Sequence, residues 1–302
     1  MRLLCFIVSL VCGLALSKPA TALNVVTTTS DLAAIAKSIG GQHVNVQSLT
    51  KGSRDPHFAE AKPSMIRKVY GADFLLLVGA ELEVGWLPVA LQAGRNAKVL
   101  PGTRGYLDLS QVVTLLDIPK GPITRAMGDV HASGNPHYWL DPLRGLKIAR
   151  AISRRFAELK PEHAASFNQA YKTFEKTLRQ KLNVWRNALA PLKSKGLLQY
   201  HKSFIYLAAA FDFRLVGEVE PLPGIAPSAR HLQKLITKIK SENIKALIME
   251  PYYDRRGAYF LRDKTEISVA VLPQSVGATP EIKTYFDLFD GIISAFRKAK
   301  VI

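Results

Sequence analysis

The sequence predicts an α/β fold in which two similar α/β lobes are joined by one long helix. Strand-like and helix-like patterns alternate over residues 23–160 and again over residues 192–302. The stretch 73–78 is apolar almost throughout, which is typical of a parallel strand covered by helices on both faces. Residues 162–189 contain no glycine or proline, a pattern long enough for about 40 Å of helix. We therefore expect a rigid connecting helix within residues 161–191, between the two lobes.

The first lobe opens with a strand and a helix. β-branched residues favour a strand over 23–29, and helical spacing follows from Leu32, with Ser30 or Asp31 expected as the N-cap. A glycine pair at 40–41 ends this helix. The other elements expected in this lobe are strands at 43–49 and 73–78 and helices at 63–70 and 142–159.

The second lobe repeats the alternation after a break at Pro191. Between the last strand of the first lobe and its final helix, residues 117–136 are rich in glycine and proline and predict a loop. The elements expected in the second lobe are strands at 196–200, 213–219, 245–249 and 267–272 and helices at 203–211, 226–242, 255–262 and 280–298.

Residues 1–22 have the pattern of a secretory signal peptide. Arg2 precedes an apolar run at 3–16, and a small-x-small sequence predicts cleavage after Ala22. The apolar run is too short for a stable membrane span. We therefore expect an exported, soluble protein.

Both cysteines of the chain, Cys5 and Cys12, fall in this leader. Because Val11 rather than a small residue precedes Cys12, a lipid anchor is not favoured. The mature chain is then expected to lack thiols, which excludes disulfides, a thiolate nucleophile and a cysteine-type zinc site.

The chain is strongly basic, with a formal net charge of +17. Its basic residues are scattered along helix patterns, and no arginine-rich arm or aromatic RNA-binding motif is present. We interpret them as a solvated surface and expect no nucleic-acid partner. A basic protein attracts cations poorly, so any metal site must depend on local ligand geometry.

Three histidines lie where a strand or loop gives way to a helix pattern. His57 follows Asp-Pro, His137 lies in the sequence Asn-Pro-His-Tyr-Trp, and His201 directly follows the strand at 196–200. Neutral imidazole is the commonest protein ligand for zinc and related metals. Ligands of open α/β sheets bind beyond the carboxyl ends of strands. The three histidines therefore predict one metal site in a cleft between the lobes.

The other four histidines are given structural roles. His163 and His231 lie within helix patterns and are expected to face solvent, and His43 is expected to pack at a strand edge. His131 lies in the glycine-rich loop, where it could pass a metal inward, but a surface position is favoured.

A fourth ligand is left open between several candidates. Glu250 directly follows the strand at 245–249 and is the first candidate, either as a ligand or as an acceptor for the N–H of a ligating imidazole. Glu220, Gln274 and a water molecule are the alternatives.

The chain resembles the zinc/manganese-type substrate-binding proteins of ABC transporters (cluster A-I), over the whole mature sequence. The matching stretches are Thr-Thr-Thr-Ser-Asp-Leu at 27–32, Asp-Pro-His-Phe-Ala-Glu-Ala-Lys-Pro-Ser at 55–64, Gly-Ala-Glu-Leu-Glu-Val-Gly-Trp-Leu at 79–87 and Asn-Pro-His-Tyr-Trp-Leu-Asp-Pro at 135–142. The resemblance implies a metal in the cleft and delivery to an ABC permease in the inner membrane, without catalysis. It also implies a periplasmic protein, which we expect to be a monomer.

Two positions depart from the family pattern. Many zinc-type members carry a long loop that is rich in His and Asp. Beyond Asp117 at its start, the loop at 117–136 here holds only Asp129 and His131 as residues of these two types. The family usually places an Asp ligand after the last strand of the second lobe, where this chain has Gln274. The site is then less negative by one charge, unless Glu250 or Glu220 enters it.

The expected donor set favours zinc. Three imidazoles and one oxygen suit a borderline metal better than magnesium or calcium, which prefer oxygen shells. Manganese or iron(II) would suit a site with two carboxylates, so a manganese- or iron-specific binding protein is one alternative. A secreted zinc-dependent hydrolase that uses the same histidines, with Glu250 or Glu220 as general base, is another.

Overall fold

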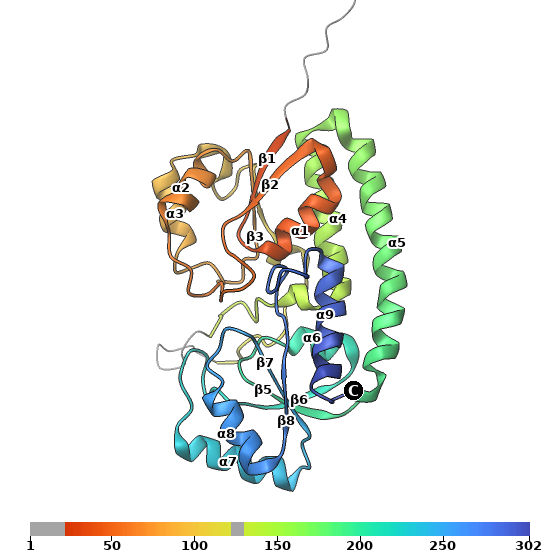
Figure 1. Cartoon of the computed structure of the whole chain (residues 1–302). Helices are drawn as coiled ribbons and strands as arrows, with labels where there is room; N and C mark the ends of the chain where they lie inside the picture. The colour runs from red at the N-terminus through yellow and green to blue at the C-terminus, as the bar shows by residue number, and fades with distance from the viewer. Residues whose placement is uncertain (1–21, 122–129) are drawn as a thin grey trace, which may run out of the picture.

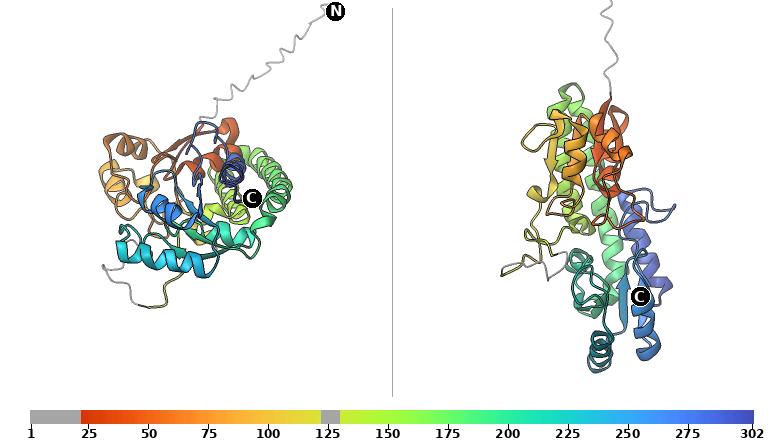
Figure 2. Two further views of the ribbon diagram at one scale, coloured as in Figure 1. Left: turned by 60° about the horizontal axis from the view of Figure 1, so that its bottom comes forward. Right: turned by 90° about the vertical axis from the view of Figure 1, so that its left-hand side faces the viewer.

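The structure is a computed structural model that describes residues 22–121 and 130–302. Residues 1–21 of the expected leader, and Asp129 of the loop, lie outside the described residues. Two α/β lobes follow one another along a single long helix (Figures 1 and 2). Within the described ranges, no helix has the length and apolar character needed to cross a membrane.

The N-terminal lobe is built on a four-stranded parallel sheet with the order β2-β1-β3-β4. Helices α2 and α3 pack against one side of this sheet, while α1 and α4 belong to the core on the other side. The elements are β1 (Leu23–Thr27), α1 (Ser30–Gly40), β2 (Val44–Ser48), α2 (Pro63–Tyr70), β3 (Phe74–Leu77), α3 (Leu87–Gly94), β4 (Tyr106–Asp108) and α4 (Pro142–Leu159).

The C-terminal lobe repeats this topology. Its parallel sheet has the order β6-β5-β7-β8, which is the same sequence of crossovers as in the first lobe. The elements are β5 (Gly196–Gln199), α6 (Ile205–Phe211), β6 (Arg214–Glu218), α7 (Ala229–Ser241), β7 (Ala246–Met249), α8 (Arg256–Thr265), β8 (Ser268–Val271) and α9 (Tyr285–Lys298).

Helix α5 (Ala164–Leu189) links the lobes and supports both of them. Its buried residues recur every three or four positions, so that one stripe faces inward. It contacts α1 and α4 of the first lobe and α9 of the second (Figure 1). The stripe comprises Phe167, Phe174, Leu178, Leu182, Trp185 and Leu189.

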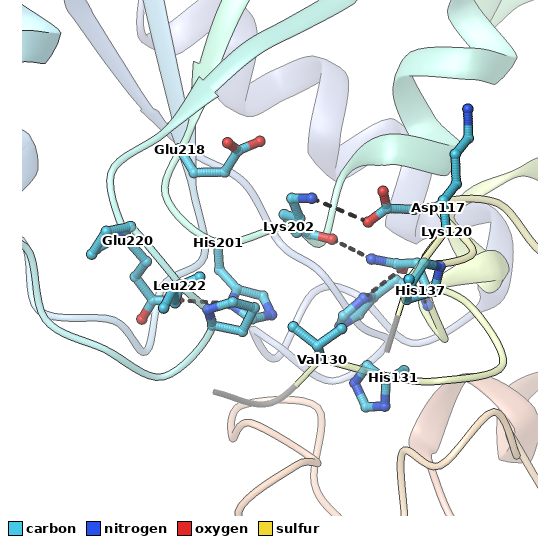
Figure 3. Close-up of a pocket in the computed structure, with 15 residues that line it drawn as sticks. Asp117, Lys120, Val130, His131, His137, His201, Lys202, Glu218, Glu220 and Leu222 are labelled. Atoms are coloured by element: carbon cyan, nitrogen blue, oxygen red, sulfur yellow. Dashed lines mark hydrogen bonds and ion pairs between the residues drawn. The ribbon is translucent and has the colours of Figure 1, made fainter. Parts of the chain in front are cut away.

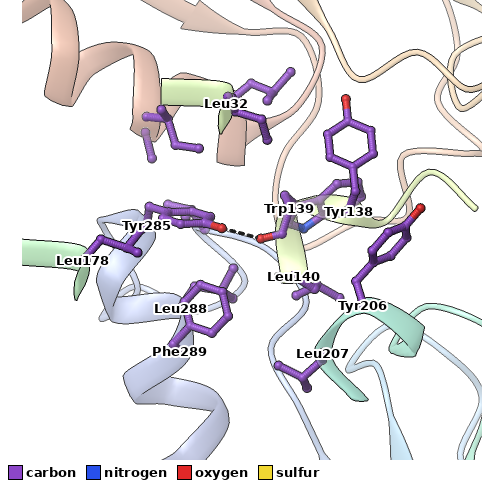
Figure 4. Close-up of a cluster of buried hydrophobic side chains, with 14 of the residues drawn as sticks. Leu32, Tyr138, Trp139, Leu140, Leu178, Tyr206, Leu207, Tyr285, Leu288 and Phe289 are labelled. Carbon is purple, nitrogen blue, oxygen red and sulfur yellow. Dashed lines mark hydrogen bonds between the residues drawn. The ribbon is translucent and has the colours of Figure 1, made fainter. Parts of the chain in front are cut away.

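The inner layers of the two lobes form one continuous hydrophobic core. Leu32 of α1, Trp139 and Tyr285 of α9 belong to the same buried cluster, although they come from different lobes (Figure 4). The Tyr285 hydroxyl donates to the carbonyl of Trp139 at 2.6 Å, and the Trp139 indole N–H donates to the carbonyl of Gln274 at 2.9 Å. Relative movement of the lobes would disturb these buried contacts, so the cleft between them has a defined width.

A second connection joins the start of α1 to the loop after β8. The Asp31 carboxylate accepts a hydrogen bond from the backbone N–H of Val276 at 2.8 Å. Nearby, a Cβ atom at Gly52 would overlap the carbonyl of Val276, which requires glycine at this close approach between lobes.

The predicted fold class is confirmed: two parallel α/β lobes are joined by a long helix. Helices at Pro63–Tyr70 and Pro142–Leu159 have the predicted limits. The predicted lobe limits of 23–160 and 192–302 remain a prediction.

Several predicted ends are wrong for local reasons. The N-cap of α1 is Thr29, whose side chain accepts from the backbone of Leu32, rather than Ser30 or Asp31. The last helix begins at Tyr285 rather than at 280, because Thr284 and Asp287 form a capping box there.

Among the described residues, one α-helix and one β-strand were not predicted. Helix α3 is only eight residues long, and β4 only three, so neither shows enough periodicity to identify it.

Burial of Asp31 predicts a pH-dependent stability. Burial raises the pKa of Asp31 to about 7. The hydrogen bond from the Val276 N–H lowers the pKa, but burial has the larger effect. The folded protein therefore holds this proton more tightly than the unfolded chain, and stability falls as pH rises from about 4 to about 7. We expect Asp31→Asn to gain stability relative to the native protein between pH 5 and pH 8, by on the order of a few kcal/mol. Denaturant unfolding of the two metal-free proteins at pH 5 and pH 8 measures their free energies of unfolding. A stability difference between the two proteins that is the same at both pH values would contradict the prediction.

Candidate metal centre

The three histidines predicted to form a site lie at the boundary between the lobes. His57 lies in the loop between β2 and α2, and His137 directly precedes the 3₁₀ turn Tyr138–Leu140 that leads into α4. His201 follows the carboxyl end of β5 in the second lobe. The carboxyl ends of the parallel strands thus direct both lobes' loops toward one cleft.

The structure brings these three side chains together. One ring nitrogen from each of His57, His137 and His201 lies within 4.8 Å of the other two. Their ring centroids are 5.1 Å apart for His57 and His137, 5.7 Å for His57 and His201, and 5.8 Å for His137 and His201. All three imidazoles are almost entirely buried.

Each imidazole is oriented by an oxygen acceptor on its Nδ1 atom. Because a carboxylate or amide oxygen only accepts, Nδ1 carries the proton and Nε2 keeps its lone pair for the cleft. The contacts are His57 with Asp55 Oδ1 at 2.6 Å, His137 with Asn135 Oδ1 at 2.9 Å and His201 with Glu220 Oε2 at 2.8 Å.

The Nε2 atoms of His57 and His137 are buried and have no hydrogen-bond partner among the described residues. Burial, reinforced by His57 and His201, lowers the pKa of His137 well below its usual range, so its imidazole is neutral. Buried polar atoms normally find a partner. Neutral, unpartnered nitrogens that converge on one point fit a metal ion.

The groups that orient the two N-terminal histidines are themselves held by the second lobe. Asp55 receives the Tyr253 hydroxyl on its other oxygen at 2.9 Å. Asn135 donates its side-chain N–H to the carbonyl of Lys202 at 2.6 Å, and its own carbonyl accepts the Tyr206 hydroxyl at 2.6 Å. The position of one lobe therefore fixes the imidazoles of the other.

These contacts also set the charge of Asp55. Burial alone would raise the pKa of Asp55, but the hydrogen bonds that His57 and the Tyr253 hydroxyl donate to it outweigh burial and lower the pKa. The carboxylate is therefore ionised behind the His57 ring.

Glu250 does not join the histidines. No Glu250 oxygen belongs to the group of ligand atoms within 4.8 Å of one another. The side chain is completely buried, and burial raises its pKa to about 8. Glu250 as a ligand therefore remains a prediction.

The other two candidates for the fourth position make different contacts. Glu220 holds His201 from behind and also accepts the backbone N–H of Gly224 at 3.3 Å. The side-chain oxygen of Gln274 accepts the hydroxyl of Tyr252. Each thus has a polar partner within the protein.

His131 is the residue near the site that sequence reasoning undervalued. Its ring centroid is 5.2 Å from that of His57, and the side chain is half-buried, so the predicted surface position is wrong. Burial, together with the nearby His57, lowers the pKa of His131 to about 4. A glycine-rich loop gives no periodicity from which this placement could have been predicted.

The histidines away from the cleft also differ from prediction. His43 and His163 stack on each other with centroids 3.9 Å apart, and His231 contacts the carbonyl of Glu218 at 2.9 Å. His163 and His231 therefore do not simply face solvent.

A cavity of about 450 Å³ opens beside the histidines (Figure 3). Its walls include His131, His137 and His201 together with Val130, Glu220 and Leu222. It gives the site a route to solvent between the loop that ends at Asn135 and the loop that follows β6.

A family model described as the periplasmic zinc-uptake complex component A (ZnuA) matches residues 25–299. The chain belongs to this family. The resemblance seen in the sequence is therefore confirmed.

Curated relatives of this ZnuA-family chain include proteins named for two metals. It is 29% identical over 235 residues to the manganese-binding lipoprotein MntA of Bacillus subtilis, covering 76% of this chain and 71% of that one. It is also 29% identical over 157 residues to the high-affinity zinc uptake system protein ZnuA of Brucella abortus, covering 52% of this chain and 46% of that one. The match therefore spans about half the length of the Brucella protein.

Solved structures share the fold of this ZnuA-family chain at low sequence identity. A crystal structure of ZnuA aligns with a TM-score of 0.76 and 23% identity, over 92% of this chain and 98% of that one. A manganese-bound periplasmic metal binding protein from Candidatus Liberibacter asiaticus aligns with a TM-score of 0.74 and 18% identity, over 91% and 98%.

The contact between Tyr253 and Asp55 predicts an effect on metal binding. Without the Tyr253 hydroxyl, Asp55 orients His57 less firmly, and loss of such outer contacts typically weakens metal binding by about 10–100-fold. We expect Tyr253→Phe to weaken zinc binding by about tenfold or more. Competition titration with a chromophoric chelator measures this. Tyr259→Phe, which removes a hydroxyl from α8 that contacts Arg255, is the matched control and should bind as the native protein does.

Proposed function

We propose that this chain is an extracytoplasmic substrate-binding protein that captures a divalent transition metal, with zinc preferred, and delivers it to an ABC importer. The observation that carries this proposal is the convergence of three buried imidazoles whose Nδ1 atoms are all held by oxygen acceptors. Membership of the zinc-uptake family supports it. His57, His137 and His201 are the proposed ligands.

Zinc is preferred because the converging donors are neutral nitrogens. Imidazole is a good ligand for zinc, whereas manganese binds better to carboxylate and water ligands. The manganese name of the Bacillus relative keeps manganese as an alternative, with iron(II) beside it. The donors of this chain favour zinc over both.

The proposed partner is an ABC permease in the inner membrane, which would receive the metal from a monomeric protein. The proposed location is the periplasm, after cleavage of a signal peptide behind Ala22. No nucleic-acid partner is proposed, since the basic residues are distributed over helix surfaces.

The proposal does not include catalysis. A hydrolase would need a free general base beside the metal. Glu220 is engaged with His201, and Glu250 is buried outside the histidine group. The comparisons give no support to the hydrolase alternative.

The first test is metal stoichiometry. Purified native protein is expected to bind one zinc ion per chain, as measured by elemental analysis after dialysis. His57→Ala, His137→Ala and His201→Ala should each lose tight binding, because each removes one ligand nitrogen. The His163→Ala protein is the matched control, since His163 lies far from the cleft beside His43.

Zinc affinity retained in His137→Ala would contradict the three-histidine site. Zinc-dependent hydrolysis of esters or peptides by the native protein would instead support the enzyme alternative.

The second test is metal preference. Because the ligands are imidazoles, zinc is expected to displace bound manganese from the native protein at equal concentrations, and manganese should not displace zinc. Competition followed by elemental analysis measures this. Preferential retention of manganese would favour the manganese-specific alternative.

A further inference from the structure

The three-histidine site needs a fourth donor if it is to hold zinc in the usual tetrahedral geometry. The carboxylates that the sequence offered lie elsewhere: Glu220 behind His201 and Glu250 outside the histidine group. Gln274 presents its side-chain oxygen to the hydroxyl of Tyr252. Glu250 has no hydrogen-bond partner on its buried oxygens among the described residues. A donor from a different part of the chain would complete the site without disturbing the contacts of Glu220 and Gln274.

His131 lies beside the three histidines in the same cleft. Its ring centroid is 5.2 Å from that of His57, against 5.1 Å between His57 and His137. It also lines the cavity onto which His137 and His201 open (Figure 3). The ring centroids of His131 and His137 thus lie at nearly the same distance from that of His57.

These separations match those of imidazoles that share a metal. A Zn–N distance of about 2.0–2.1 Å places a ring centroid about 3.2 Å from the ion, and two rings at the tetrahedral angle then have centroids roughly 5.2 Å apart. The pair of His57 and His131 has this separation, whereas the pairs of His201 with His57 and His137 are wider, at 5.7 and 5.8 Å.

The segment that carries His131 is fixed to the N-terminal lobe. The Ser133 hydroxyl donates to Glu81 Oε1 at 2.7 Å, and the Ser133 backbone N–H contacts Glu81 Oε2 at 3.4 Å. The His131 side chain hydrogen-bonds to the backbone of Ala80. These contacts hold the segment so that the His131 ring lies beside that of His57.

We propose that His131 is the fourth ligand, so that the metal is held by four neutral imidazoles in place of three imidazoles and a carboxylate. This rests on the proposed function. His131 lies outside the group of atoms within 4.8 Å of one another, so its ring turns toward the group when metal binds. Such a neutral donor set selects zinc over manganese more strongly than a site with a carboxylate.

Zinc X-ray absorption on the zinc-loaded full chain tests the assignment. The native protein is expected to show four imidazole nitrogens, and His131→Ala three imidazoles and one oxygen, with zinc affinity at least about tenfold weaker. Lys120→Ala, in the same loop, and His163→Ala, far from the cleft, are the controls and should match the native protein.

Three imidazoles and an oxygen in the native spectrum, or an unchanged spectrum and affinity in His131→Ala, would overturn the assignment while leaving the three-histidine site intact. A native chain that binds no zinc would overturn the proposed function and the assignment with it.

A carboxylate substitution gives an independent readout. His131→Asp is expected to retain one zinc per chain and to raise manganese affinity relative to zinc by about tenfold, because it supplies the oxygen donor that manganese favours. An unchanged ratio of the two affinities would overturn the assignment.

Discussion

The site depends on the fixed separation of two lobes that share one core. His57 and His137 come from one lobe and His201 from the other, so a small change in lobe separation would take one nitrogen out of reach of the other two. The buried hydrogen bonds of Tyr285 to Trp139, and of Trp139 to Gln274, cross this boundary close to the site, since the ring centroid of Trp139 is 5.3 Å from that of His137. Metal affinity and lobe packing are therefore properties of the same contacts.

The orienting contacts extend this dependence to the individual rings. Asp55 and Asn135 hold the rings of the first lobe, and each also bonds to the second lobe, through Tyr253 and through Lys202. Separation of the lobes would remove these bonds and free the imidazoles to rotate. A partner that pulled the lobes apart would thereby loosen both His57 and His137, without having to contact the metal.

The sequence predicted what local patterns determine. Alternating strand and helix patterns predicted both lobes, and the absence of glycine and proline over 162–189 predicted the long helix α5. His57, His137 and His201 were predictable since each follows a strand or precedes a helix. His131 was not, because its position depends on the contact of Ser133 with Glu81, which lies 52 residues away. Tertiary contacts of this kind leave no trace in local spacing.

The placement of the carboxylates explains how a chain with a formal charge of +17 can hold a cation in a buried site. Asp55 and Glu220 lie behind His57 and His201, one hydrogen bond away from the imidazoles rather than among the converging nitrogens. Two negative charges in these positions would offset the charge of a divalent ion bound on the other side of the imidazoles. The attraction between the carboxylates and the ion stays strong because the site is buried and little water lies between them. The neutral nitrogens then decide which metal is bound, and the carboxylates behind them decide how tightly. Gln274, where the resemblance led us to expect an Asp, is consistent with this division, since a third carboxylate would leave the occupied site with a net negative charge.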